Sequence, residues 1–148
     1  MRHMDAQDSR IADILGDMFN TDEFTLEDCV DAFYKHLTKS LQLPCDVTGI
    51  EDFRWEEFYV FGPGDREEYK ELCKTQPSYK DVFELMAIKT DVYSEWIMCS
   101  GEDLTAHVRR KSDGKEFYLG LSEIKAVDKK SINYPLIDDY AVWFVNNR

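Results

Sequence analysis

Apolar and polar residues alternate most regularly in two stretches between Asp103 and Leu121, on either side of the pair Asp113-Gly114. The apolar members of the two stretches are Leu104, Ala106, Val108, Phe117, Leu119 and Leu121. A period of two predicts strands that bury one face. Asp-Gly suits a two-residue type I′ turn, in which both central residues need positive φ. We therefore expect a β-hairpin, and because an isolated hairpin is marginal in water, further strands and a helix should cover its apolar face.

Other short apolar segments have the length of strands. They are Cys45–Ile50, Val82–Ile88, Ser94–Ser100 and Ile124–Val127. Because Val82–Ile88 is mostly apolar, we expect it at the centre of the sheet. The residues Phe53–Phe61 that follow the first of these strands are rich in aromatic side chains.

Helical spacing of apolar residues predicts a helix at each end of this strand-rich region. Ser9–Phe19 is a short amphipathic helix with Ser9 as its expected N-cap, and a longer helix begins at Thr25, with Asp28 completing a capping box. Leu43-Pro44 ends the longer helix, because the residue before proline favours extended geometry.

Two further helices complete the prediction. Asp65–Lys74 is predicted as a short surface helix after the break at Gly62-Pro63-Gly64. The C-terminal helix should be capped by Asn133, because Pro135 in a first turn sacrifices no helical hydrogen bond.

Short strands enclosed by helices predict an α+β fold. We expect a small, strongly bent antiparallel β-barrel of the SH3-like kind, flanked by N-terminal and C-terminal helices. The 148 residues fit a single domain, in which residues 1–24 are an N-terminal extension and residues 25–148 hold the helix, the barrel and the C-terminal helix.

Composition narrows the possible functions. A formal charge of −12 argues against nucleic-acid binding, which requires a basic face. No apolar run approaches membrane-spanning length, so we expect a soluble cytoplasmic protein with no membrane partner. The four cysteines form no CxxC pair, which argues against zinc, and none of the common catalytic motifs is present, so we expect no enzyme.

Four segments together resemble a known family. They are FYKHLTKSLQLPCDVTGI at 33–50, VFELMAI at 82–88, DGKEFYLGLSEI at 113–124 and LIDDYAVWF at 136–144. In this order they resemble the small bacterial calcium-binding proteins of the CcbP type, over roughly residues 33 to 146. The Ser9–Phe19 helix is additional to the resemblance, and the connection Trp55–Tyr79 is longer.

The resemblance implies calcium bound by carboxylates from separate segments, since the chain has no EF-hand loop. By position, the implied ligands are Asp81, Glu84, Asp103, Asp138 and Asp139. Four of them also have an ordinary explanation. Asp138 and Asp139 suit the first turns of a helix, Asp103 suits a turn, and Glu84 suits the outward face of an edge strand.

A second acidic group, Glu51, Asp52, Glu56 and Glu57, indicates either a solvated face or a weaker cation site. The basic run at 109–111, with Lys115, is typical of a solvated hairpin tip and alternatively suits an acidic partner. Two functions therefore stay open. One is a calcium buffer or sensor whose partner is Ca²⁺. The alternative is a metal-independent, SH3-like interaction module that binds another protein through Phe53–Phe61 or a barrel edge.

Overall fold

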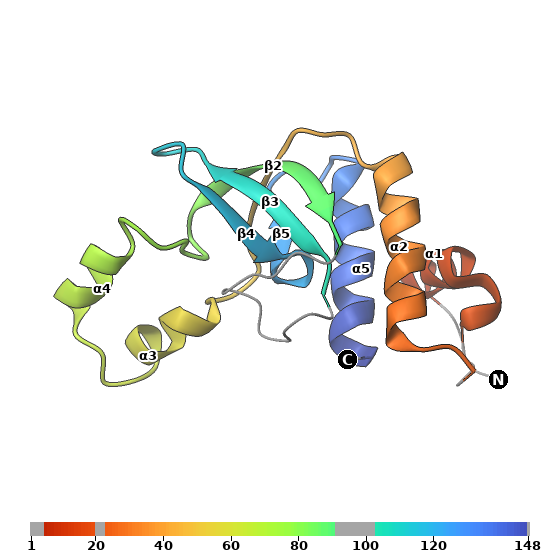
Figure 1. The fold of residues 1–148 in the computed structure, drawn as a ribbon, viewed down its shortest axis with the longest axis horizontal. Coiled ribbons are helices and arrows are strands. Elements are labelled where there is room, and N and C mark those ends of the chain that lie inside the picture. The colour runs from red at the N-terminus through yellow and green to blue at the C-terminus, as the bar shows by residue number, and fades with distance from the viewer. Residues whose placement is uncertain (1–4, 20–22, 91–102, 148) are drawn as a thin grey trace.

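The computed structural model describes residues 5–19, 23–90 and 103–147. Its α-helices are α1 (Ala6–Leu15), α2 (Leu26–Ser40), α3 (Glu57–Val60), α4 (Arg66–Leu72) and α5 (Asn133–Asn147). Its 3₁₀ turns are η1 (Gly16–Met18), η2 (Arg54–Glu56) and η3 (Leu121–Glu123). Its strands are β1 (Cys45–Gly49), β2 (Val82–Lys89), β3 (Thr105–Arg110), β4 (Glu116–Gly120) and β5 (Ile124–Ala126). Figure 1 shows α1, α2 and α5 at one end of the sheet and α3 with α4 at the other.

The strands form one antiparallel sheet in the order β4-β3-β2-β1-β5. The predicted α+β class is confirmed, and β2 lies at the centre of the sheet as expected. A closed barrel is not confirmed, because β4 and β5 are the two edges of an open sheet in the described part of the chain. The strand predicted at Ser94–Ser100 lies outside the described residues.

The β3–β4 hairpin has the predicted arms but a wider turn. Arg110 N donates to Lys115 O at 2.7 Å, and Gly114 N donates to Arg110 O at 2.7 Å, so residues 111–114 form the loop. Gly114 supplies the positive φ, at +76°. Asp113 accepts hydrogen bonds from Lys115 N and from the Arg110 guanidinium, and these bonds favour the wider loop over the two-residue turn.

The core lies between the sheet and the helices α2 and α5. Phe33 of α2 and Tyr140 of α5 are fully buried, and their rings meet edge to face at 5.4 Å between centroids. The sheet contributes the buried side chains Val47, Phe83, Leu85, Ala106, Val108 and Leu119. Burying each large apolar side chain stabilises the fold by about 1.5–3 kcal/mol, so this layer fixes α5 against the sheet.

Helix ends follow the predictions in part. The capping box of α2 is confirmed by reciprocal bonds between Thr25 and Asp28, at 3.0 and 3.1 Å. The predicted cap of α1 is wrong, because Asp5 accepts from Asp8 N at 2.7 Å and the helix begins before Ser9. Asn133 does not cap α5 with its side chain. That side chain bonds both backbone groups of Gln42 and so ties the start of α5 to the end of α2.

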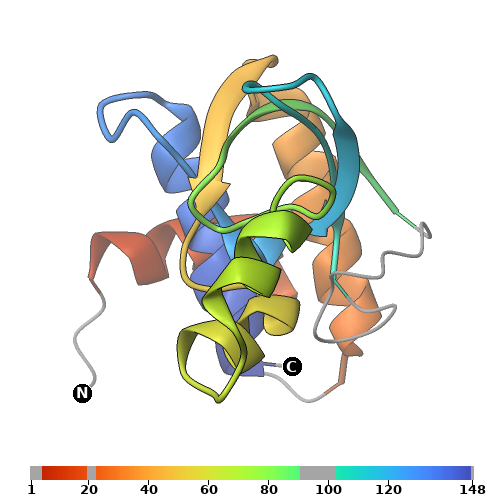
Figure 2. The same cartoon turned by 90° about the vertical axis from the view of Figure 1, so that its left-hand side faces the viewer.

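Residues 53–80, here called the aromatic lobe, project from the sheet and include η2, α3 and α4. Figure 2 shows α3 and α4 in front of the sheet when the molecule is viewed from that end. The short helix predicted at Asp65–Lys74 is confirmed as α4, whereas Phe53–Phe61 is mainly helical. No described helix is long and apolar enough to cross a membrane.

Candidate cation site

Two of the five predicted ligands, Asp81 and Glu84, lie at the start of β2 and face guanidinium groups. Asp81 Oδ2 accepts from Arg110 Nη1 and from Ser78 N, both at 3.0 Å. Glu84 Oε1 accepts from Arg109 Nη2 on the neighbouring strand. A calcium ion at either carboxylate would have to compete with the positive charge already paired with it.

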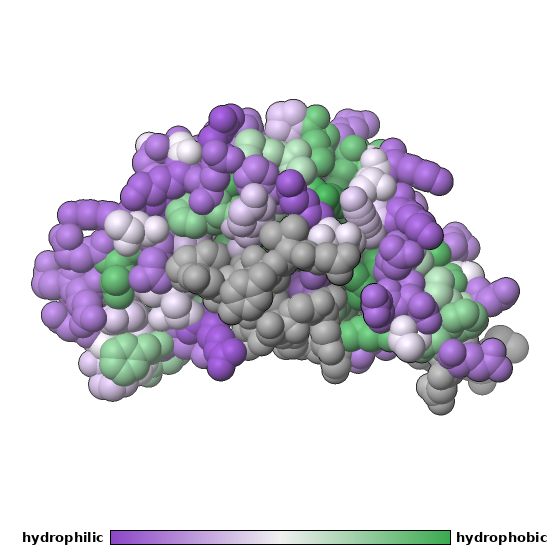
Figure 3. All heavy atoms as spheres, viewed as in Figure 1, coloured by the Kyte–Doolittle hydropathy of each residue, from purple (hydrophilic) through white to green (hydrophobic). Residues whose placement is uncertain are grey.

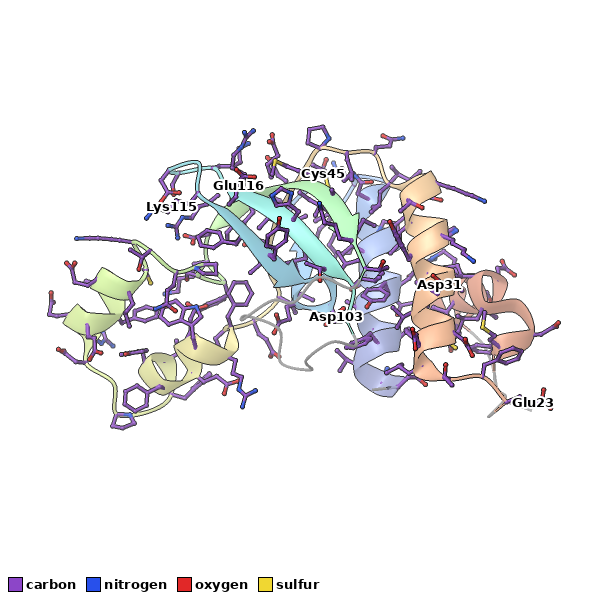
Figure 4. All side chains as sticks on the ribbon, in the orientation of Figure 1. Glu23, Asp31, Cys45, Asp103, Lys115 and Glu116 are labelled. Carbon is purple, nitrogen blue, oxygen red and sulfur yellow. The ribbon has the colours of Figure 1, made fainter. Side chains whose placement is uncertain are left out.

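Asp103 is buried between the start of β3 and α5 (Figure 4). Its carboxylate accepts from Ser122 Oγ and from the Tyr140 hydroxyl, both at 2.6 Å, and from Ser122 N at 3.2 Å. Burial raises the pKa of this carboxyl, and the hydrogen bonds from Ser122 and Tyr140 act in the opposite direction. Asp103 thus links β3, η3 and α5 through donors that are all neutral.

Asp138 and Asp139 of α5 accept hydrogen bonds from side chains of α1. Asp139 is only 1% exposed and accepts from Arg10 Nε at 2.7 Å and Arg10 Nη2 at 2.9 Å. Gln7 Nε2 donates to both carboxylates, at 2.9 Å to Asp138 Oδ2 and 3.0 Å to Asp139 Oδ1. Asp139 therefore holds α1 against α5, while Asp138 is half-buried and also lines a pocket.

The pocket has a volume of about 340 Å³ and opens between the segment after β1, the turn η3 and helix α5. Four carboxylates line it: Glu51, Asp52, Glu123 and Asp138. No lysine, arginine or histidine is among the lining residues, and the other walls are mainly apolar side chains of α5 and of residues 50–53. The electrostatic field of such a pocket favours a cation.

Sheet pairing explains why these acids meet. Strands β1 and β5 are antiparallel with Gly49 opposite Ile124, so the residues just after β1 lie beside those just before β5. Ile50 N donates to Glu123 O at 3.0 Å, which extends this pairing by one step. Helix α5 packs on η3 and β5 and adds Asp138 to the same pocket.

The donor types fit a hard cation better than a transition metal. Calcium binds six to eight oxygens at about 2.3–2.6 Å, and the pocket offers carboxylates without cysteine or histidine. Within the described residues, however, no three Asp, Glu, His or Cys side chains are already placed to hold a metal ion. The pocket carboxylates would have to move inward, with water or carbonyl oxygens completing the ligand shell.

The four residues of the second acidic group lie in three different environments. Glu51 and Asp52 line the pocket, and Glu57 is exposed on α3. Glu56 is fully buried and accepts four hydrogen bonds: from Phe53 N, Tyr79 N, Ser78 Oγ and the Tyr69 hydroxyl. A solvated position was therefore the wrong prediction for Glu56, whose four bonds hold the aromatic lobe together.

Arg110 is the second side chain that the sequence analysis misplaced. It was expected on a solvated tip, but it is 3% exposed and bonds the carbonyl oxygens of Cys73, Lys74 and Gln76 at 2.9 Å each. The available clue was its position, because Arg110 lies on the same face of β3 as Ala106 and Val108.

Comparison with known proteins identifies the fold. No family model and no curated protein matches the sequence. Two solved structures match over 97% of the chain. Anabaena CcbP has 17% sequence identity and a TM-score of 0.56, and 94% of its own length is covered. A calcium-binding protein in its calcium-binding form has 18% sequence identity and a TM-score of 0.57, and 97% of its own length is covered. The matched span includes α1, which the sequence resemblance did not reach. The predicted likeness to CcbP-type proteins is thus confirmed as a likeness of fold, and the chain is similar in structure to Anabaena CcbP.

Proposed function

We propose that this protein binds calcium without enzymatic activity, and that the ion binds in the pocket between residues 50–53, η3 and α5. The observation that carries the proposal is the charge of this pocket, which has four carboxylates and no basic side chain on its walls. Support comes also from the fold, because one of the two proteins of similar structure is described as a calcium-binding protein in its calcium-binding form.

The mechanism follows from the charges of the chain's own residues. Without a cation, Glu51, Asp52, Glu123 and Asp138 repel one another across the pocket. A bound Ca²⁺ would remove that repulsion and draw the segment after β1 toward η3 and α5. Because only the folded chain brings these segments together, binding stabilises the native state by about 2.7 kcal/mol at a free calcium concentration of 100 times Kd.

A buffer and a sensor would differ in how far this closure changes the surface. A sensor would change its structure on binding and expose or reshape a contact face, whereas a buffer would bind with little rearrangement. Amide hydrogen exchange with and without calcium distinguishes them. Protection confined to residues 50–53, 121–123 and 138–146 indicates a buffer, and changes that extend to the outer sheet face indicate a sensor.

Thermal unfolding in EDTA and in millimolar calcium tests the proposal. We expect calcium to raise the unfolding midpoint of the wild type, and Asp52→Asn and Asp138→Asn to reduce that rise. Glu84→Gln is the matched control, since Glu84 lies outside the pocket and pairs with Arg109. A midpoint that calcium leaves unchanged contradicts the proposal.

The same experiment compares two ligand sets. Asp138 belongs to both, whereas Asp81, Glu84, Asp103 and Asp139 as calcium ligands stay a prediction from the family resemblance. If the calcium-induced rise of the unfolding midpoint were lost in Glu84→Gln and kept in Asp52→Asn, the ligands would be those implied by the family resemblance and the pocket would not be the site.

A further inference from the structure

The aromatic lobe exposes large apolar side chains at its end. Phe58 is 54% exposed and Phe61 is 81% exposed, and Val60 lies between them in sequence with 39% exposure. Figure 3 shows an apolar group at this end of the molecule, over the position of α3, with hydrophilic residues around it. We call Phe58, Val60 and Phe61 the lobe patch. Single exposed apolar side chains are common on protein surfaces, whereas a contiguous group of them, especially of aromatic ones, is typical of an interaction surface.

The lobe patch is held rigidly by the residues beneath it. Trp55 Nε1 donates to Pro77 O at 2.6 Å, and Glu56 accepts its four hydrogen bonds directly before α3. The rings of Trp55, Tyr59 and Tyr69 lie 5.6–6.2 Å apart, and Phe58 meets Tyr59 edge to face at 5.1 Å. A partner would therefore bind a surface that is already ordered, which lowers the entropic cost of association.

Close backbone contacts after α3 add to this rigidity. Gly64 N donates to Phe58 O at 3.1 Å. A Cβ at Gly64 would lie 2.4 Å from the Tyr59 ring, and one at Gly62 would lie 2.6 Å from Phe58 O. The two glycines thus allow the chain to fold back tightly on α3, and this turn leaves Phe61 at the outside of the bend.

Charge around the lobe patch indicates what covers it. Residues 57–72 contain five acidic and two basic side chains, and one of the two bases, Lys70, pairs with Glu67 at 3.7 Å. Glu68 lies close to the patch, because its carboxylate accepts from the Tyr59 hydroxyl at 3.0 Å. A second copy of a chain with a charge of −12, or an anionic membrane, would meet repulsion here.

We propose that the lobe patch is a docking surface for a basic segment of another protein that carries apolar anchor residues. The apolar side chains of the segment cover Phe58 and Phe61, and its lysine or arginine residues face the acidic side chains of α3 and α4. This interaction needs no calcium, so it stands or fails separately from the proposed function.

The test uses two designed helical peptides of about 18 residues, in which leucines form one face and either lysines or glutamates form the other. Fluorescence anisotropy of the labelled peptides is measured in EDTA with the full chain. The variants are Phe61→Ser and, as a control, Ile132→Ser, which replaces a side chain that is 54% exposed and lies just before α5. Glu57→Lys and the control Asp13→Lys change the net charge equally, within and outside the lobe.

We expect the lysine peptide to bind the wild type and Ile132→Ser equally, and Phe61→Ser about tenfold more weakly. Glu57→Lys should weaken binding more than Asp13→Lys does, and the glutamate peptide should not bind. Circular dichroism melts confirm that each variant is folded, which Phe61→Ser should be because that side chain is largely exposed.

Several results would overturn the proposal. Absence of lysine-peptide binding, equal binding by Phe61→Ser, or equal binding of the glutamate peptide would each exclude a basic partner at the lobe patch. A dimer in sedimentation that Phe61→Ser dissociates would assign the patch to a second copy. Phosphatidylserine vesicles bound by the wild type and not by Phe61→Ser would assign it to a membrane.

Discussion

Replacement of Arg110 by methionine tests how the aromatic lobe is attached to the sheet. The guanidinium bonds the carbonyl oxygens of Cys73, Lys74 and Gln76 and the carboxylates of Asp81 and Asp113. Methionine keeps the apolar stem of the side chain and removes the guanidinium group, whose central carbon lies 5.2 Å from the centroid of the Phe117 ring. The substitution therefore removes the hydrogen bonds and the charge with little loss of packing.

The expected cost can be worked out from these contacts. A hydrogen bond contributes about 1 kcal/mol net, so the three carbonyl bonds together contribute about 3 kcal/mol. The two carboxylates contribute less, because the side chains of Asp81 and Asp113 are 26% and 35% exposed and regain water. We expect the free energy of unfolding to fall by about 3 kcal/mol.

Arg109→Met is the matched control at the next residue. The Arg109 side chain is 50% exposed and pairs with Glu84, so its loss should cost under about 1 kcal/mol. Urea unfolding followed by tryptophan fluorescence measures both variants, and amide exchange reports whether residues 66–76 lose protection in Arg110→Met alone. Equal stabilities for the two variants would refute the role given to Arg110.

The stability difference between the wild type and Arg110→Met should also depend on pH. The hydrogen bonds from Arg110 lower the pKa of Asp113 from 3.8 to about 2. A lowered folded-state pKa contributes stability above pH 3.8 that is lost as the pH falls toward 2. The stability difference between the wild type and Arg110→Met should therefore narrow over that range, and a gap that widens there would contradict the pairing.

Substitutions at two further residues test the buried carboxylates. Glu56→Ala should destabilise the protein by about 3 kcal/mol, because alanine leaves four donors without an acceptor. Glu56→Gln should cost about 1–2 kcal/mol, because glutamine keeps one acceptor oxygen. Urea unfolding that shows a cost under about 1 kcal/mol for both variants would contradict this role of Glu56. Burial raises the folded-state pKa of Asp103, so its contribution to stability falls as the pH rises above 3.8, and Asp103→Asn should show no such loss. Urea unfolding at several pH values measures how the stability of the wild type relative to Asp103→Asn changes with pH. If the wild type became more stable relative to Asp103→Asn as the pH rises, the predicted direction would be wrong.

Local patterns were sufficient to predict most of the elements. The alternation around Val108, the capping box at Thr25 and the apolar run of β2 each depend on neighbouring residues only, and the structure confirms all three. Arg110 shows where local reasoning failed. Its charge indicated a solvated tip, and the partners that make burial favourable are carbonyl groups more than thirty positions earlier in the chain.

The candidate site was only partly predictable for the same reason. Asp138 was among the predicted ligands, and Glu51 and Asp52 were noted as acidic, but nothing local connected them with Glu123. Their convergence depends on the pairing of β1 with β5 and on the packing of α5 over η3, which are long-range contacts. Glu56 resembles its acidic neighbours in sequence, and only the fold turns it inward.

Calorimetric titration with Ca²⁺ tests the central claim most directly. The protein is first stripped with EDTA, and the wild type is compared with the double variant Asp52→Asn/Asp138→Asn and with Glu84→Gln. We expect saturable heat for the wild type and Glu84→Gln, and a Kd at least about tenfold higher for the double variant, since two of the four pocket carboxylates are neutralised. No heat from the wild type, or the same Kd for the double variant, would contradict a calcium site in this pocket.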